Sequence, residues 1–100
     1  MADKMSALDE AKKLVHGDRQ ADYGHPARDF ATITEILNAL GFRRMDARGK
    51  LRELKPTDHP IIMQAVKLSR EYHRPKRDNR VDGAGYWETL QMVHDYEGNE

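Results

Sequence analysis

Cysteine is absent from this 100-residue chain. Without thiols, a disulfide framework, a thiolate metal site and a cysteine nucleophile are all excluded. Long apolar runs are missing too: no window approaches the roughly 20 apolar residues that cross a membrane, and the first residues lack the apolar core of a signal peptide. We therefore expect a cytoplasmic protein that does not contact membranes.

An excess of charge of either sign is also missing, because 17 lysines and arginines balance 17 aspartates and glutamates. No global field then holds the chain on nucleic acid. Aromatic residues make up only 7% of the chain and are sparse near the cations, which argues against a stacking platform for bases. We do not expect nucleic-acid binding, and any anion binding must come from local patches.

Several patterns that mark known chemistry do not occur. The chain has no Gly-rich phosphate loop and no nucleophile elbow, so Walker-type nucleotide binding and covalent catalysis have no support. Alternating strand patterns and repeats are absent as well. What remains is helical periodicity in a single domain, residues 1–100.

Helical periodicity predicts four main helices that begin or end at capping and breaking residues: one between Ser6 and Gly17, one from about Ala27 to Leu40, one from Thr57 to about His73, and one that Asp78 caps. The second helix carries an apolar stripe, formed by Phe30, Ile33, Ile36, Leu37 and Leu40. The apolar side of the third consists of Ile61, Ile62, Ala65, Val66, Ser69 and Tyr72.

The remaining segments are predicted to be irregular. Residues 18–26 have breakers and no period, which indicates a structured loop. Residues 42–56 form a basic, partly mobile connecting loop, and we expect 1–5 and 97–100 to be frayed. With 38% hydrophobic and 34% charged residues, the apolar supply is thin for a monomer. The expected fold is thus an all-α bundle completed by homodimerisation.

The first polar motif is Asp22-Tyr23-Gly24-His25-Pro26, with Arg19 before it. Gly24 permits a positive φ and the proline stiffens the exit, so the tyrosine and histidine gain fixed positions from which they can stack on a base or donate a hydrogen bond. Equally, the motif is a turn between helices in which Tyr23 packs on the core and Asp22 caps.

The second motif lies on the third helix, where Lys67, Arg70 and Glu71 share one face at spacings of three and four residues. Two cations beside a carboxylate suit a phosphate next to a metal. The alternative is a solvated helix face on which Lys67 and Glu71 pair.

The third motif, residues 78–86, places Asp78 and Asp82 one turn apart, as hard oxygen ligands of magnesium require. Gly83 and Gly85 follow, and each costs about 1 kcal/mol relative to alanine inside a helix. They therefore indicate close approach of another helix or of a ligand. The alternative makes Asp78 an N-cap and Gly85 a packing notch.

Together these motifs resemble an uncharacterised family of small bacteriophage and prophage proteins. They also resemble, more weakly, the all-α nucleotide pyrophosphohydrolases of the MazG-like and phosphoribosyl-ATP pyrophosphatase group, which are dimeric bundles with carboxylates that hold magnesium. This second resemblance implies magnesium on Glu71, Asp78 and Asp82, with Glu71 and Asp82 catalytic. It implies substrate binding by Arg19, Tyr23, His25, Lys67, Arg70, Asn79 and Tyr86. Arg70 and Asn79 stand where that group usually has glutamates.

Three functions follow as hypotheses. The first is a nucleotide-handling protein, with magnesium-dependent hydrolysis of a nucleoside triphosphate to release pyrophosphate. The second is nucleotide binding without turnover, which the replaced glutamates favour because cations bind phosphate directly. The third is an interaction protein that binds a host factor through the basic segments 43–52 and 74–80. A phage-encoded protein would act in the host cytoplasm.

Overall fold

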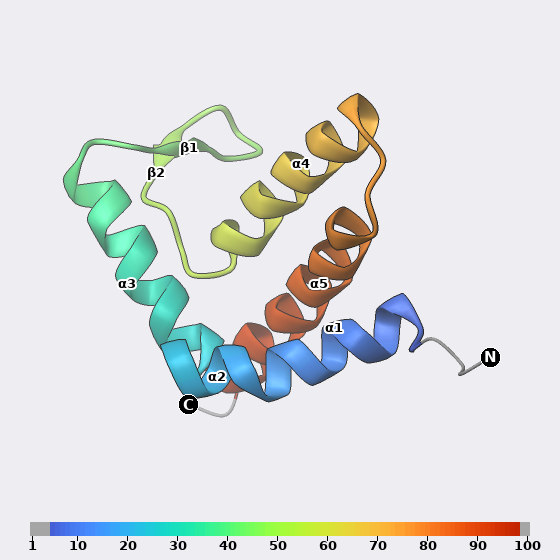
Figure 1. Ribbon diagram of the computed structural model, residues 1–100. Helices are drawn as coiled ribbons and strands as arrows, with labels where there is room; N and C mark the ends of the chain where they lie inside the picture. The colour runs from blue at the N-terminus through green and yellow to red at the C-terminus, as the bar shows by residue number, and fades with distance from the viewer. Residues whose placement is uncertain (1–4, 99–100) are drawn as a thin grey trace.

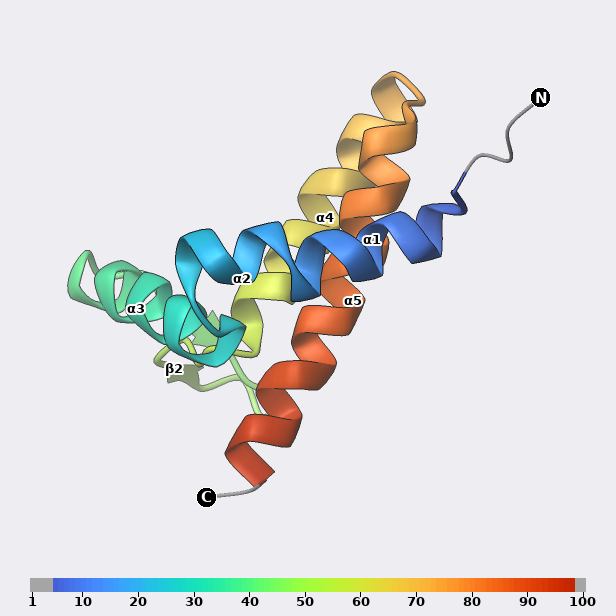
Figure 2. The ribbon, with the colours of Figure 1, turned by 60° about the horizontal axis from the view of Figure 1, so that its bottom comes forward.

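The computed structural model describes residues 5–98, and within that range the chain forms five helices and one small hairpin (Figure 1). The helices are α1 (Ala7–His16), α2 (Asp18–Tyr23), α3 (Pro26–Ala39), α4 (Asp58–His73) and α5 (Arg77–Gly98), and the strands are β1 (Arg44–Met45) and β2 (Leu51–Arg52). Helices α4 and α5 lie side by side, while α1 crosses α5 (Figure 2). The predicted all-α class and the four main helices are confirmed.

Local sequence signals set most of the helix ends. Ser6 caps α1, since its Oγ accepts a hydrogen bond from the Asp9 N–H at 3.0 Å. Pro26 occupies the first position of α3, where its missing N–H costs nothing. Gly24 ends α2 with a φ of 78°, a conformation that L-residues other than glycine rarely adopt.

The loop predicted for residues 18–26 is wrong in its first part, because Asp18–Tyr23 forms the short helix α2. Gly17 breaks the backbone with φ −112° and ψ −102°, and the helix then resumes in a new direction. All six residues of α2 are partly or fully exposed. A helix that buries no side chain shows no apolar period, which explains why periodicity missed it.

Two predicted caps are also corrected. Thr57 has helical angles and makes no side-chain cap, and Asp78 lies inside the first turn of α5 because that helix begins at Arg77. Residues 97 and 98, which were predicted to be frayed, belong to the last turn of α5. The other predicted frayed ends, apart from Met5, lie outside the described residues.

The buried core is small and lies along α5. Val15 of α1 packs beside Gly85. Further along the helix, α3 contributes Phe30, which packs with the fully buried Val93. The ring of His59 in α4 contacts that of Phe30 in a tilted arrangement, with ring centroids 4.5 Å apart, and burial lowers the pKa of His59. Helix α5 is therefore the element on which the other long helices pack.

The predicted apolar sides of two helices are only partly turned inward. In α3, Phe30 is buried, but Ile36 and Leu40 are 56% and 70% exposed. In α4, Ile61 is 45% exposed and Tyr72 is 94% exposed. The sequence correctly indicates the helices, but the packing within one chain covers a different side of α4.

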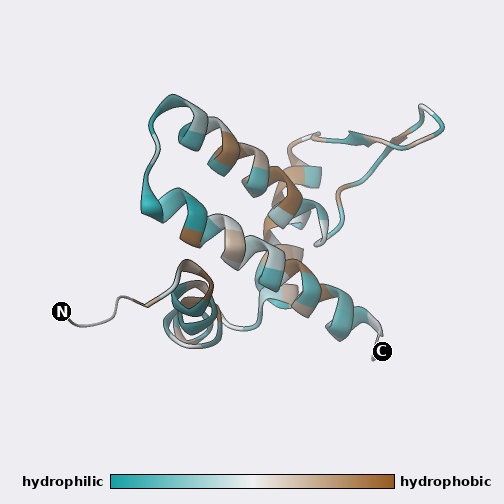
Figure 3. Cartoon of the chain, turned by 90° about the vertical axis from the view of Figure 1, so that its right-hand side faces the viewer, coloured by the Kyte–Doolittle hydropathy of each residue, from teal (hydrophilic) through white to brown (hydrophobic). Residues whose placement is uncertain are grey.

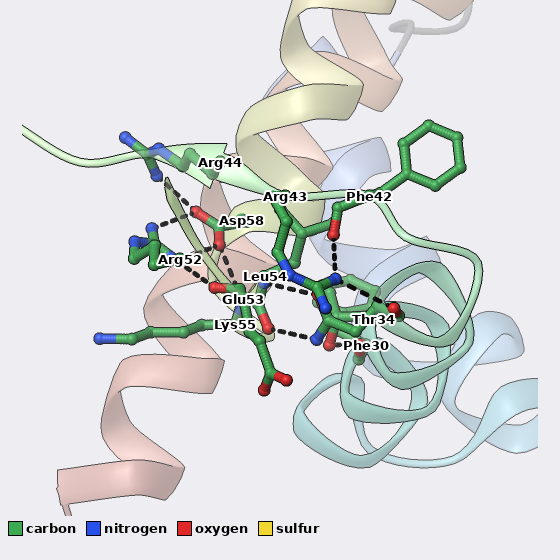
Figure 4. Close-up of polar contacts among 11 residues, drawn as sticks. Phe30, Thr34, Phe42, Arg43, Arg44, Arg52, Glu53, Leu54, Lys55 and Asp58 are labelled. Carbon is green, nitrogen blue, oxygen red and sulfur yellow. Dashed lines mark hydrogen bonds and ion pairs between the residues drawn. The ribbon is translucent and has the colours of Figure 1, made fainter. Parts of the chain in front are cut away.

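Residues 42–56 are not simply a basic loop. Strands β1 and β2 pair antiparallel, with Arg44 opposite Arg52, and both guanidinium groups bind the carboxylate of Asp58 at the start of α4 (Figure 4). Arg52 donates at 2.9 and 3.0 Å, and the Lys55 N–H donates at 2.7 Å. The Asp58 residue is only 2% exposed, so it anchors the hairpin to α4.

The other side of this connection is held to α3. The Asn38 side chain donates to the Leu54 carbonyl at 3.0 Å and accepts from the Leu54 N–H at 2.8 Å, in the manner of a strand partner. Because α3 and α4 contact each other little, these side-chain bonds fix the segment between them.

Asp58 should make acid stability depend on its own ionisation. Burial alone would raise the pKa of Asp58, but hydrogen bonds from Arg52, the Lys55 N–H and Arg44 outweigh that effect and lower the pKa to about 2. A carboxylate with a lowered pKa stabilises the fold above its unfolded pKa, near pH 4. This contribution is lost as the pH falls from about 4 to about 2.

Replacement of Asp58 by asparagine should reduce the free energy of unfolding at pH 7 by about 2 kcal/mol. It should also flatten the loss of stability between pH 4 and pH 2. Urea melts across this pH range measure both effects. Asp22→Asn is the control, since Asp22 is exposed and should change stability by under about 0.5 kcal/mol. Equal pH profiles for wild type and Asp58→Asn would contradict the anchoring role.

The two α5 glycines occupy positions where neighbouring helices come close. A Cβ at Gly85 would lie 3.3 Å from Val15 Cγ2 of α1, and one at Gly83 would lie 3.2 Å from Gln64 Oε1 of α4. Both distances are tighter than ordinary carbon contacts. The close approach that the glycines indicated is therefore that of helices, one on each side of α5.

Gly85→Leu should consequently push α1 away from α5 and lower the free energy of unfolding by about 1 to 3 kcal/mol. Gly98→Leu is the matched control, because nothing lies within 4 Å of a Cβ at Gly98. Denaturant melts of both variants provide the comparison. If Gly85→Leu were as stable as wild type, α1 and α5 could accommodate the larger side chain without loss of stability.

Candidate functional site

Asp82 joins three helices by ion pairs. Its Oδ2 lies 2.9 Å from Lys67 Nζ of α4, and its Oδ1 lies 3.5 Å from Arg19 Nη2 of α2. The side chains of Lys67 and Asp82 are 14% and 22% exposed, whereas that of Arg19 is 50% exposed. The Lys67 contact is therefore the better shielded from solvent and the stronger of the two.

Glu71, the other predicted catalytic carboxylate, is engaged at the turn between α4 and α5. It accepts hydrogen bonds from the Lys76 N–H at 2.9 Å and from Asn79 Nδ2 at 3.2 Å, and it pairs with Arg80. The Lys76 N–H bond is the largest cause that lowers the pKa of Glu71, and Asn79 and Arg80 add to it. Glu71 thus holds the turn in its conformation.

A groove of about 570 Å³ opens beside this turn, between the C-terminal half of α4 and the start of α5. It is lined by polar and charged residues of both helices and of the turn: Lys67, Ser69, Arg70, His73, Arg74, Lys76, Asp78, Asn79 and Asp82. The second and third motifs lie apart in the sequence, but five of their predicted site residues come together here: Lys67, Arg70, Asp78, Asn79 and Asp82.

The groove is locally positive in a chain whose net charge is zero. Four cationic side chains face two aspartates, so the lining carries a charge of +2 when His73 is neutral. Within residues 5–98, the side chains of Arg70, Arg74 and Lys76 have no ion-pair partner. Three cations are thus available to an anion without breaking a contact in the fold.

The first motif lies elsewhere. Tyr23 is 64% exposed and lines a crevice of about 60 Å³ together with Arg19 and Tyr86. His25 caps α3, since its Nδ1 accepts from the Ala27 N–H at 3.0 Å, and its ring lies 5.0 Å from that of Tyr96. The segment does join two helices, as the alternative had it, but Tyr23 is exposed instead of packed on the core, and the cap of α3 comes from His25 instead of Asp22.

The predicted magnesium ligands do not form one cluster. In the described part of the chain, no group of three or more histidine, cysteine, aspartate and glutamate side chains is arranged to hold a metal ion. Glu71 is bound to the turn and is not part of the groove lining, and Asp82 is paired with two cations. Both carboxylates are thus engaged by protein groups in this structure.

Sequence reasoning missed Arg74 and Lys76 as site residues. It treated the segment 74–77 as a helix break with a general basic character. The available signal was position: a basic turn that directly follows a helix places its cations beside Lys67 and Arg70 at the end of that helix. A tight turn between two packed helices makes this adjacency a geometric necessity.

Comparison with known proteins places this fold in a family. The chain is 30% identical over 94 residues to the Gene 55 protein of Mycobacterium phage D29, an alignment that covers 90% of this chain and 54% of the relative. The chain thus spans about half the length of that relative. No solved structure matches this chain. None of the helices in residues 5–98 is long and apolar enough to cross a membrane.

The profile of one protein family, described as a domain of unknown function (DUF6378), matches residues 6–94. This match includes every predicted site residue and all elements from α1 to most of α5. The chain therefore belongs to the DUF6378 family.

Proposed function

We propose that the protein binds a phosphorylated small molecule, preferably a nucleotide, in the groove between α4 and α5. The observation that carries this proposal is the set of unpaired cations there, Arg70, Arg74 and Lys76. Long cationic side chains that line a concave surface and lack partners suit a multiply charged anion, because guanidinium groups bind phosphate oxygens through paired hydrogen bonds.

The size of the groove supports the same ligand class. Small-molecule sites usually measure about 300 to 1,000 Å³, and this groove falls within that range at about 570 Å³. Two other grooves of similar size each contain glutamate, and one of them is lined by no cation. The crevice beside Tyr23 is too small for a base. Base recognition by Tyr23 and His25 therefore has less support than phosphate recognition.

Asp78 and Asp82 limit how much negative charge the groove accepts. Lys67 already neutralises Asp82 in the free protein, so a phosphate near this pair competes with Asp82 for the Lys67 ammonium group. We infer that the phosphates lie toward Arg70 and Arg74, away from Asp82. Removal of the Asp82 charge should then leave binding unchanged or strengthen it.

Arg70→Ala and Arg74→Ala should each weaken the binding of a nucleoside triphosphate or of inorganic pyrophosphate by about 1.5 to 3 kcal/mol, the worth of a charge-assisted hydrogen bond. Asp82→Asn should leave affinity unchanged or raise it. Calorimetric titrations without magnesium measure these changes. Arg48→Ala, at an exposed cation of the hairpin turn, is the matched control and should bind like wild type. Equal losses in all arginine variants would indicate nonspecific charge attraction.

Magnesium-dependent pyrophosphohydrolysis is the second candidate function. It is favoured by the resemblance to the all-α pyrophosphohydrolases and by one observation, that Asp78 and Asp82 both line the same groove as the cations. In that case Asp82→Asn should abolish pyrophosphate release from a nucleoside triphosphate while the fold stays intact, because an amide is a poor substitute for a hard anionic oxygen. An inactive wild type that binds nucleotide without metal would reject hydrolysis and retain binding.

Binding of a host factor through the basic segments has weaker support. In segment 43–52, Arg44 and Arg52 are bound to Asp58, and Arg80 is bound to Glu71. These cations stabilise the fold and are less available to a partner. If the protein binds neither nucleotide nor pyrophosphate, this third function becomes the one to test.

A further inference from the structure

Helix α4 packs in this chain by its more polar side. Gln64 donates to the Gly83 carbonyl of α5 at 2.7 Å, Lys67 pairs with Asp82, and Glu71 bonds to Asn79. These residues follow one another at intervals of three and four, so they form one stripe along the helix. The contact between α4 and α5 therefore includes two hydrogen bonds and an ion pair along this stripe.

The adjacent stripe of α4 is apolar and uncovered. It is displaced by one residue from the polar stripe and consists of Ile61, Ala65, Leu68 and Tyr72, at intervals of four, three and four residues. Leu68 is 70% exposed and Tyr72 is 94% exposed. Figure 3 shows hydrophobic colour recurring along α4, the uppermost helix in that view. An apolar stripe of this length is what a helix normally buries.

The protein exposes more surface than a compact monomer of its size, and the excess is large enough to include a dimer interface. Its accessible surface is 7487 Å², whereas a compact monomer of this mass exposes about 5,800 Å². The radius of gyration is 15.1 Å, against about 13 Å for a compact chain of this length. The excess of about 1,700 Å² is more than the roughly 800 Å² that each partner buries in a standard interface.

We propose that the stripe Ile61, Ala65, Leu68 and Tyr72 is a homodimer interface that a second copy of this chain covers with its own α4. A second copy fits because the stripe is self-complementary when the two helices run antiparallel. Ala65 then lies opposite Leu68 of the second copy and Ile61 lies opposite Tyr72, so that a small side chain meets a larger one in each pair. The same twofold rotation repeats both pairs.

A parallel arrangement is less favourable on two grounds. It would place Ala65 against itself, which leaves a void, and Tyr72 against itself, which overfills the contact. It would also align the two helix dipoles in the same direction, whereas antiparallel helices place opposite dipole ends together. The proposed interface lies on a different side of α4 from Lys67, so the groove remains accessible.

Sedimentation equilibrium at tens of micromolar tests the interface. Wild type should have twice the 11.6 kDa chain mass, and Leu68→Glu should have the monomer mass. Leu8→Glu is the matched control because Leu8 is 72% exposed on α1, and this variant should stay dimeric. A monomeric wild type, or a dimeric Leu68→Glu, would overturn the proposal. Circular dichroism verifies that the variants are helical.

Disulfide cross-linking tests the same interface without introducing a charge. The chain contains no cysteine of its own, so a disulfide can form only between introduced cysteines. Ile61→Cys and Tyr72→Cys chains, mixed and oxidised, should form a disulfide between the two types of chain. Neither variant should cross-link when oxidised alone. A disulfide in the Tyr72→Cys sample alone would overturn the antiparallel arrangement, and no disulfide in the mixture would overturn the interface. Neither result depends on whether the groove binds phosphate.

Discussion

The fold depends on one constraint, that α5 must accept helices at close range on opposite sides. It can do so because Gly83 and Gly85 present no side chain where α4 and α1 approach. The cost of two glycines inside a helix, about 1 kcal/mol each, is offset by contacts that larger residues would block. Val15 packs beside one glycine and Gln64 bonds to the carbonyl of the other. The α4–α5 groove exists because these helices are held at this separation.

The sequence predicted the long helices because their ends carry local signals, such as Ser6 and Gly17 around the first helix. It did not predict the hairpin, because strands of two residues are too short to show alternation. The Asp58 carboxylate that anchors the hairpin gathers two arginines that are 6 and 14 residues away. Periodicity does not report charge pairs of this kind, so nothing in the sequence singled out Asp58.

The candidate site was predictable where it follows helix geometry. Spacing placed Lys67 and Arg70 near one another, and the pairing of two consecutive helices brings Asp82 to them. Sequence could not show that Glu71 is committed to the turn, since its partners lie beyond a helix break. Nor could it show which stripe of α4 packs on α5, because the more apolar stripe is the expected one. In the structure, the polar stripe of α4 faces α5. This orientation forms the groove and leaves the apolar stripe of α4 exposed to solvent.

The contact between α1 and α5 joins the two ends of the chain. Val15 lies against Gly85, and His16 Nε2 lies 2.5 Å from Glu88 Oε2, across 72 residues. The α4–α5 pair forms across a short turn, whereas docking of α1 must close a loop of nearly the whole chain and bears the larger entropy cost. Helix α1 is therefore held on α5 by contacts between residues that lie far apart in the sequence. Its detachment would free Arg19 in α2 from Asp82, so local opening at the N-terminal end would change the charge balance beside the groove.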